Sequence, residues 1–225
     1  MRLLSTKHLA PSFRDRLIQH GFSLIEQPFI QIQELPFQKK EIHNNLIFTS
    51  QNAVKIAFSK EEITTQIQGR KYYCVGEKTK TLIEKNGQIV IKMSPNAAEL
   101  VQFLIKKGQN EQFSFFCGKL RRPEIETQLF ENKIEFNTHK IYDTLITPVE
   151  INKVFDGVLF FSPSAVISYF KTNTWNSETH GFCIGNTTAA ELAKHTKNFS
   201  VAKEPTDAQL LLSIHNYYTQ HHAQK

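Results

Sequence analysis

Two pairs of short motifs carry side chains that are suited to holding an anion. The first pair is Thr49-Ser50-Gln51-Asn52 and Ser162-Pro163-Ser164, each of which follows a short apolar run and precedes a helical pattern. Each motif therefore brings hydroxyl groups next to the unpaired backbone N–H groups of a helix start, an arrangement suited to a carboxylate or a phosphate. The same residues are ordinary N-caps, which contribute about 1 kcal/mol each without any ligand, and this simpler interpretation stays open.

The second pair of motifs places a glycine at the turn from a strand into a helix. Val75-Gly76-Glu77-Lys78-Thr79 and Ile184-Gly185-Asn186-Thr187-Thr188 let backbone N–H groups approach a ligand closely, although a tight turn alone also explains each glycine. Neither motif has the spacing of a dinucleotide fingerprint or of a P-loop. Because each half of the chain carries two such anion-suited turns, we expect them to line a cleft for a large polyanion.

Other kinds of chemistry find little support in the sequence. Cys74, Cys117 and Cys183 lie far apart, each in or at the end of an apolar run, so we expect small buried side chains and a reducing, cytoplasmic compartment. The histidines are scattered, and no nucleophile or zinc-protease motif occurs, which argues against covalent and metal-dependent catalysis. Three cations in Lys119–Arg122 stand at a predicted helix start; a bound anion would explain them, as would exposed arginines without a role.

The charge is mildly positive and spread along the chain. Twenty-seven Lys and Arg residues against 21 Asp and Glu residues give a formal net charge of +6, which is compatible with an anionic ligand. A nucleic-acid binder ranks last among the functions considered, because the cations do not gather on one element. No apolar run approaches the roughly 18 residues of a membrane helix, and the start of the chain lacks the apolar core of a signal peptide.

The chain is internally repeated with a period of about 112 residues. Ile47–Val54 corresponds to Leu159–Val166, 112 positions later, and Cys74–Thr79 corresponds to Cys183–Thr188, 109 positions later. Fainter matches 112 positions apart pair Lys7, Pro11 and Leu17 with Lys119, Pro123 and Leu129. Blocks that keep one order at nearly one spacing predict two similar domains.

Each half predicts alternating strands and helices. Continuous apolar runs suit strands of a parallel sheet that is covered on both faces, and they span residues 46–48, 72–75, 113–117, 158–161 and 182–184. Between two of these runs, apolar residues at helical spacing over 97–105 predict a helix, with Ser94-Pro95 as its cap and first-turn proline. Strand and helix in repeated alternation predict α/β domains.

Two long extended segments, Ser23–Gln33 and Ile134–Ile146, interrupt this pattern at equivalent places. A strand that is longer than its own sheet requires can leave one domain and enter the other. We therefore interpret the two segments as paired connectors between the halves. The residues themselves leave open whether the halves are tandem domains or exchange segments.

The succession of these motifs resembles the uroporphyrinogen-III synthase family. The residues that carry the resemblance are Phe48–Val54, Val75-Gly76-x-x-Thr79, Gly118-x-x-x-Arg122, Tyr142-Asp143-Thr144, Phe161–Val166, Ile184-Gly185-x-x-Thr188-Ala189 and Glu204-Pro205-Thr206. No single motif is specific. Their order, spacing and coverage from the first strand to the last helix carry the match.

The resemblance implies two flavodoxin-like, three-layer α/β domains with parallel sheets, joined by a two-stranded connector, with the ligand cleft between them. Domain 1 is then discontinuous and consists of residues 1–36 and 149–225, and domain 2 is inserted as residues 42–140. The connectors are residues 37–41 and 141–148. On this resemblance the two halves exchange segments.

The resemblance also implies an activity. The family closes hydroxymethylbilane to uroporphyrinogen III with loss of water and inversion of ring D through a spiro intermediate, without metal or organic cofactor. The family's tyrosine maps to Tyr142, which we expect to act as the acid or hydrogen-bond donor for the leaving hydroxyl. The substrate-binding residues carried over are Thr49, Ser50, Gly76, Thr79, Gly118, Ser162, Ser164, Gly185, Thr187 and Thr188. A cytoplasmic monomer is expected, with a transient contact to the upstream hydroxymethylbilane synthase.

Two departures from the family pattern affect single carboxylate contacts. Thr6-Lys7-His8 stands where Thr-Arg-Pro is common, so a point charge replaces a bidentate guanidinium. Lys80 stands where the family usually has alanine. The alternative function is a noncatalytic two-domain module that binds an anionic ligand.

Overall fold

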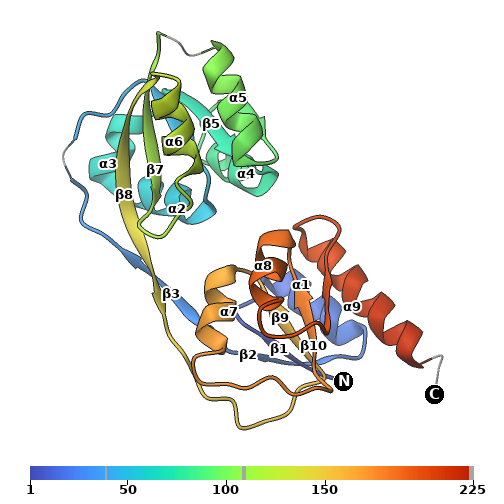
Figure 1. The fold of residues 1–225 in the computed structure, drawn as a ribbon. Helices are drawn as coiled ribbons and strands as arrows, with labels where there is room; N and C mark the ends of the chain where they lie inside the picture. Colours follow the sequence, from blue (N-terminus) through green and yellow to red (C-terminus); the bar gives the residue numbers. More distant parts are fainter. Residues whose placement is uncertain (39, 108–109, 223–225) are drawn as a thin grey trace. The chain divides into compact units, whose positions relative to one another are not determined.

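The computed structural model describes residues 1–38, 40–107 and 110–222, and it divides into two compact units (Figure 1). Unit 1 contains Met1–Gln31 and Leu145–Lys225, and unit 2 contains Ile32–Thr144. The first crossing therefore precedes the expected connector 37–41, because the chain continues to pair within the sheet of unit 2 directly after Gln31. The second crossing falls inside the expected connector 141–148.

Unit 1 is built around a five-stranded sheet with the order β11-β10-β9-β1-β2, in which every described pairing is parallel. Its elements are β1 (Arg2–Ser5), α1 (Pro11–Gln19), β2 (Ser23–Glu26), β9 (Gly157–Phe160), α7 (Pro163–Tyr169), β10 (His180–Cys183), α8 (Asn186–Leu192), β11 (Phe199–Val201) and α9 (Asp207–His222). Successive strand residues pack into different cores. Leu3 and Leu159 lie under α1 and α9, whereas Leu4 and Phe160 lie under α7 and α8.

Unit 2 has a sheet with the order β3-β8-β7-β4-β5-β6. Its elements are β3 (Ile30–Glu34), β4 (Asn45–Phe48), α2 (Gln51–Ser59), α3 (Glu61–Ile67), β5 (Lys71–Val75), α4 (Glu77–Lys85), β6 (Val90–Ser94), α5 (Ala97–Lys107), β7 (Gln112–Gly118), α6 (Glu124–Glu131) and β8 (Glu135–Ile146). Phe48 packs under α2, α3 and α4, and Ile47 packs under α5 and α6. Both units therefore have three layers, which explains why their strands read as continuous apolar runs.

The two sheets have the same arrangement built from different parts of the repeat. Numbered along the chain, the strands of unit 1 lie in the order 2-1-3-4-5, which is the flavodoxin-like order. In unit 2, β7, β8, β4, β5 and β6 occupy the places that β1, β2, β9, β10 and β11 occupy in unit 1. Each repeat therefore contributes its first strand, helix and strand to one unit and its remaining elements to the other, so the repeats exchange segments.

The five apolar runs predicted as strands are strands β4, β5, β7, β9 and β10, with ends shifted by one or two residues. The extended segment Ile134–Ile146 is confirmed as the single strand β8, but Ser23–Gln33 is broken into β2 and β3. Pro28, which has no N–H to donate to a ladder, lies in the break.

The strands that cross between the units run antiparallel to each other. The Leu35 N–H donates to the Ile141 carbonyl at 2.9 Å, and the Thr147 N–H donates to the Phe29 carbonyl at 3.0 Å. Along the two strands, the residue number of one strand rises while the number of the residue bonded to it falls, which indicates antiparallel pairing. The expected two-stranded connection is thus part of regular sheet structure.

One predicted helix start is wrong. Ser94 does not cap α5 but is the last residue of β6, where its carbonyl accepts a hydrogen bond from the Gly76 N–H at 2.9 Å. Asn96 caps the helix instead, because its side-chain oxygen accepts from the Glu99 N–H at 2.9 Å. In the described ranges, no helix combines the length and the apolar character that crossing a bilayer requires.

Candidate functional site

The expected site residues of each unit gather at the carboxyl edge of that unit's sheet. In unit 2, Thr49 and Ser50 follow β4, Gly76 and Thr79 follow β5, and Gly118 ends β7. These three strands are neighbours in the order β7-β4-β5. In unit 1, the adjacent strands β9 and β10 are followed by the expected residues Ser162, Ser164, Gly185, Thr187 and Thr188. The cleft expected between the domains stays a prediction.

Tyr142 reaches across the end of β7 to the end of β4. Its phenol donates a hydrogen bond to the Ser50 Oγ at 2.9 Å. A bulge in β8 makes this possible: Cys117 is paired with Lys140, but Gly118 is paired with Tyr142, so Ile141 is an extra residue. Bulges commonly redirect a side chain at the rim of a sheet. Here the bulge brings a phenol from β8 to the first residue before α2.

Gly118 makes room for the Tyr142 ring. A Cβ atom added at Gly118 would lie 2.6 Å from the ring atoms Cε2 and Cζ of Tyr142 and 3.0 Å from its hydroxyl oxygen. The backbone holds the two strands together at this point, because the Lys119 N–H donates to the Tyr142 carbonyl at 2.8 Å. Gly118, expected as a binding residue, therefore has a steric reason to be glycine that does not involve any ligand.

Tyr142 is a buried, protonated phenol. Its side chain packs in the core of unit 2 with 7% of its surface exposed, and burial raises the pKa of Tyr142 even though the hydrogen bond with Ser50 acts in the opposite direction. A phenol with a raised pKa keeps its proton at neutral pH. The site can therefore supply a hydrogen-bond donor, and it is poorly suited to supply a phenolate base.

Both strand-end serines are N-caps, so the simpler interpretation of these motifs is confirmed. The Ser50 Oγ accepts a hydrogen bond from the Asn52 N–H at 3.1 Å, and the Ser162 Oγ accepts from the Ala165 N–H at 3.2 Å. The two serines differ in their second contact. Ser50 also accepts from Tyr142, whereas the residue 112 positions before Tyr142 is Ile30, which has no hydroxyl.

The two glycine turns are alike in hydrogen bonding and different in backbone conformation. Gly76 and Gly185 are the N-caps of α4 and α8, and neither helix has a side-chain cap. Thr79 N–H donates to the Gly76 carbonyl and Thr188 N–H to the Gly185 carbonyl, both at 3.1 Å, and both threonines are buried. Gly76 has φ of +83°, a conformation that only glycine adopts readily, whereas Gly185 is extended at φ of −177°.

The cations at the start of α6 are balanced by carboxylates of the same unit. Lys119 Nζ lies 3.3 Å from Asp143 Oδ2, and Arg121 forms an ion pair with Glu126. The first turn of α6 contains acidic residues, which suit the positive end of a helix. These ion pairs explain how the fold accommodates Lys119 and Arg121 at the helix start, and both sequence-based interpretations stay open.

The three cysteines are free and buried, as predicted from their apolar surroundings. Burial raises the pKa of Cys74, Cys117 and Cys183 to about 12. Thiols in this state are poor nucleophiles at neutral pH. In the described part of the chain, no group of three or more His, Cys, Asp or Glu side chains is placed to hold a metal ion.

The chain matches a family model described as "Uroporphyrinogen-III synthase HemD" over residues 12–211. The chain belongs to the uroporphyrinogen-III synthase family. This confirms the resemblance given by the motifs, and with it the activity of a uroporphyrinogen-III synthase, a lyase in heme biosynthesis. Nothing in the comparisons supports the alternative of a noncatalytic module.

Solved structures of uroporphyrinogen-III synthases resemble the chain over nearly its whole length. The enzyme from Helicobacter pylori 26695 is 18% identical with a TM-score of 0.71, and the match covers 96% of this chain and 100% of that one. A mutant of the enzyme from the extremely thermophilic bacterium Thermus thermophilus is 13% identical with a TM-score of 0.68, covering 98% and 99%. At sequence identities this low, the structural similarity is evidence for the fold alone. No curated protein sequence matches the chain significantly.

For this uroporphyrinogen-III synthase, the roles of Tyr142 and of the expected binding residues stay predictions.

A concavity of about 400 Å³ in unit 1 lies away from these residues, beside Phe155, Asn173 and Thr179 near the amino ends of β9 and β10. The Asn173 amide at its wall is already bonded, since Oδ1 accepts from the Ile151 N–H and Nδ2 donates to the Val149 carbonyl, each at 2.8 Å. This hollow is no better candidate for the chemistry than the carboxyl edges.

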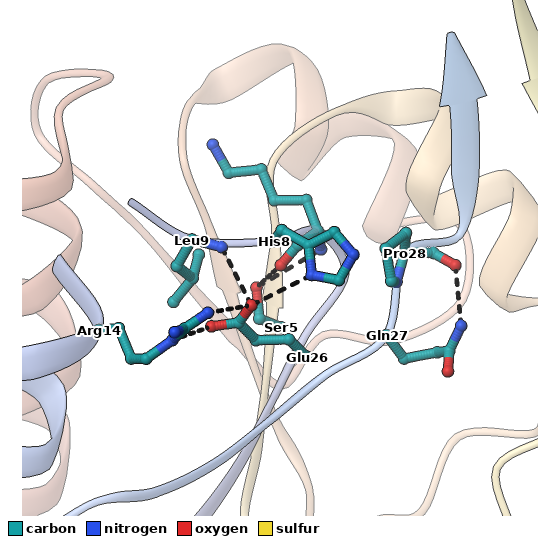
Figure 2. Close-up of polar contacts among 8 residues, drawn as sticks. Ser5, His8, Leu9, Arg14, Glu26, Gln27 and Pro28 are labelled. Atoms are coloured by element: carbon teal, nitrogen blue, oxygen red, sulfur yellow. Dashed lines mark hydrogen bonds and ion pairs between the residues drawn. The ribbon is translucent and has the colours of Figure 1, made fainter. Parts of the chain in front are cut away.

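Sequence reasoning missed a polar cluster at the carboxyl edge of unit 1 (Figure 2). Glu26, the last residue of β2, accepts hydrogen bonds from Arg14 Nε at 2.7 Å, Arg14 Nη2 at 3.0 Å and the Leu9 N–H at 3.3 Å, and it lies 3.3 Å from His8 Nδ1. The hydrogen bond from Arg14 holds the pKa of Glu26 below its usual value. No local pattern reveals the cluster, because its members come from a strand, a loop and a helix.

Proposed function

We propose that the chain closes hydroxymethylbilane to uroporphyrinogen III with the help of the Tyr142–Ser50 pair. The family assignment supports the reaction, and the partly buried hydrogen bond between the Tyr142 phenol and the Ser50 hydroxyl is the observation that supports the roles of these residues. The pair lies at the carboxyl edge of a parallel sheet, where α/β proteins bind their ligands.

The first chemical step is loss of water from the hydroxymethyl group. The C–O bond breaks, the adjacent pyrrole N–H gives up its proton, and the products are one water molecule and an electron-poor azafulvene. A substituted carbon of ring D then attacks the azafulvene and forms the spiro intermediate. The bond from that carbon to the bridge carbon of ring C breaks and leaves an azafulvene on ring C. The free α-carbon of ring D attacks this azafulvene and loses its proton, which closes the macrocycle with ring D inverted. The step that needs a protein donor is the departure of the hydroxyl.

In our proposal, the Ser50 hydroxyl donates a hydrogen bond to the leaving hydroxyl of the substrate, and Tyr142 orients the Ser50 hydroxyl. Tyr142 is 7% exposed, whereas Ser50 is half-buried at the start of α2. Because the Ser50 oxygen already accepts from the phenol and from the Asn52 N–H, its own O–H is directed away from both, toward an incoming hydroxyl. Because the pKa of Tyr142 is raised, the hydrogen bonds from Tyr142 through Ser50 to the substrate are favoured over complete transfer of the phenol proton.

Binding of the substrate carboxylates is assigned to the helix starts at the carboxyl edges. The expected residues around Gly76 and Gly185 precede helices without side-chain caps, whose first N–H groups have no acceptor within the helix. A net charge of +6 favours a substrate that carries an acetate and a propionate on every ring. Most of the remaining work is to hold the flexible substrate in the curled geometry that leads to inversion.

The test is turnover of freshly generated hydroxymethylbilane, followed by oxidation and separation of the uroporphyrin isomers. The substrate closes to isomer I without the enzyme, so this reaction sets the blank. We expect predominantly isomer III. Formation of isomer I alone by the folded protein would contradict the proposed activity.

Three finer expectations belong to the same proposal: a cytoplasmic location, a monomeric state and a transient contact with the upstream hydroxymethylbilane synthase. The location is supported by three free, buried cysteines. Sedimentation of the chain alone should give the mass of one copy. Adding the upstream synthase at low micromolar concentration should leave the sedimentation of the chain unchanged, because the contact is transient. In a coupled assay, the same addition should shorten the lag before isomer III forms.

A further inference from the structure

The loop that follows β1 is tied down by a carboxylate–guanidinium pair. Arg14 on α1 holds Glu26 with two hydrogen bonds, and Glu26 in turn accepts from the Leu9 N–H and lies next to His8 (Figure 2). Only 10% of the Glu26 side chain is exposed. The loop between β1 and α1 is therefore fixed at its far end by a charge pair from two other elements.

The equivalent loop of unit 2, which follows β7, is tied down by a second such pair. Glu126 on α6 pairs with Arg121, whose Nε donates to Glu126 Oε2 at 2.9 Å. Arg121 Nη1 also donates to the carbonyls of Gly118 and Lys119 at 3.3 Å each, and Thr138 Oγ1 donates to Glu126 Oε1 at 3.1 Å. About a fifth of each charged side chain is exposed.

The two pairs serve equivalent loops but are built from different positions of the repeat. At a spacing of 112, Arg14 corresponds to Glu126, so the helix contributes the cation in one unit and the carboxylate in the other. Likewise Glu26 corresponds to Thr138, and both contact the helix residue. The feature common to both units is thus the fixed loop, and the residues that fix it are interchangeable.

Each fixed loop carries a lysine at the same place. Lys7 and Lys119 are 112 positions apart, and both are exposed. Lys7 Nζ lies 4.1 Å from the centroid of the Phe161 ring, one residue before Ser162. Lys119 Nζ lies 3.3 Å from Asp143, one residue after Tyr142. Each ammonium group is therefore held beside expected site residues of its own unit.

We propose that Arg14–Glu26 and Arg121–Glu126 are positioning pairs, each of which fixes the loop that presents a lysine, Lys7 or Lys119, to a carboxylate of the substrate. The inference deepens the proposed function, because it rests on a ligand with several carboxylates. A loop that is already fixed loses less backbone freedom when a carboxylate binds to the lysine that the loop carries.

The experiment compares Glu26→Gln, Lys7→Met and the double variant, using two readouts. One is KM and kcat with hydroxymethylbilane, and the other is the affinity for uroporphyrin III, which requires no turnover. We expect Glu26→Gln and Lys7→Met each to raise KM and the uroporphyrin Kd about fivefold, with kcat within twofold of the unaltered chain. In the double variant we expect no further increase, because Glu26 acts through Lys7.

Glu191→Gln is the matched control, because Glu191 forms an exposed ion pair with Lys194 at 2.7 Å on another element of unit 1. Glu191→Gln should change neither KM for hydroxymethylbilane nor the Kd for uroporphyrin III. The proposal is overturned if Glu26→Gln leaves both KM and Kd unchanged, or if its effect multiplies with that of Lys7→Met. The uroporphyrin affinity separates this outcome from failure of the proposed function, which would show as isomer I from the unaltered chain.

Discussion

The two units share one strand arrangement but differ at the end of the central strand. At the end of β4 in unit 2, Ser50 caps a helix and also receives the phenol of Tyr142. At the end of β9 in unit 1, Ser162 caps the corresponding helix, and Ile30 occupies the position that corresponds to Tyr142. The duplicated fold thus supplies similar anion-suited edges, and one bulged strand adds a buried donor to only one of these equivalent places.

The largest expected effect comes from filling the space beneath the Tyr142 ring. Gly118→Ala places a Cβ atom 2.6 Å from the ring, so the phenol must move away from Ser50. We expect the turnover rate to fall by about 100-fold, because misplacing catalytic groups by about 1 Å costs this much. Gly185→Ala in unit 1 is the control, since its Cβ would only touch Pro205 at 3.9 Å. Because Gly185 is an expected binding residue, both rates are compared at saturating substrate. Equal rates for both variants would contradict the assignment of the donor to unit 2.

Acid should destabilise unit 2 through His139. This ring is 3% exposed and stacks between Phe116 and Phe37, and burial lowers the pKa of His139 to about 4. Between about pH 6.5 and pH 4, the unfolded chain binds the proton and the folded chain does not, so stability falls as the pH falls through this window. The loss should approach about 3 kcal/mol.

Urea unfolding at pH 7 and pH 4.5 measures this loss. His139→Gln introduces the residue found at the equivalent position of unit 1, Gln27, and should remove most of the pH dependence. An unchanged slope of stability against pH in that variant would exclude His139 as its source.

The two glycine turns should respond differently to alanine. Gly76→Ala forces a side chain into φ of +83° and should cost about 1–3 kcal/mol of the free energy of unfolding. Gly185→Ala changes an extended residue whose added Cβ would make only an ordinary contact with Pro205, and it should cost less than about 0.5 kcal/mol. Thermal unfolding of both variants measures the difference; equal losses would show that the turns are not distinguished by backbone strain.

The two capping serines should have similar effects on stability and different effects on the turnover rate. Ser50→Ala and Ser162→Ala should each cost about 1 kcal/mol of folding free energy, because each removes one N-cap. Only Ser50→Ala should also slow turnover at saturating substrate. A rate loss of the same size in Ser162→Ala would mean that the units contribute equally to the chemical step.

The sequence predicted the features that depend on local pattern. Continuous apolar runs gave the buried strands, and hydroxyl and glycine motifs gave the strand ends where helices begin. It could not give the bulge at Ile141, because a bulge is defined by the partner strand. The Arg14–Glu26 contact was missed for the same reason, since its residues lie on a helix and a strand. The cap of α5 was misassigned because Ser94 extends β6 by one residue, which leaves Asn96 next to the helix.

The most direct test of the central claim is the turnover rate of Tyr142→Phe at saturating hydroxymethylbilane, with Tyr169→Phe as a control at another buried tyrosine. We expect Tyr142→Phe to lose about tenfold or more in rate, because the hydrogen bond that orients the Ser50 hydroxyl toward the leaving group is lost, with unchanged affinity for uroporphyrin III. Tyr169→Phe should keep the full rate. A full rate in Tyr142→Phe with unchanged affinity would contradict the role of the Tyr142–Ser50 pair in the departure of the hydroxyl.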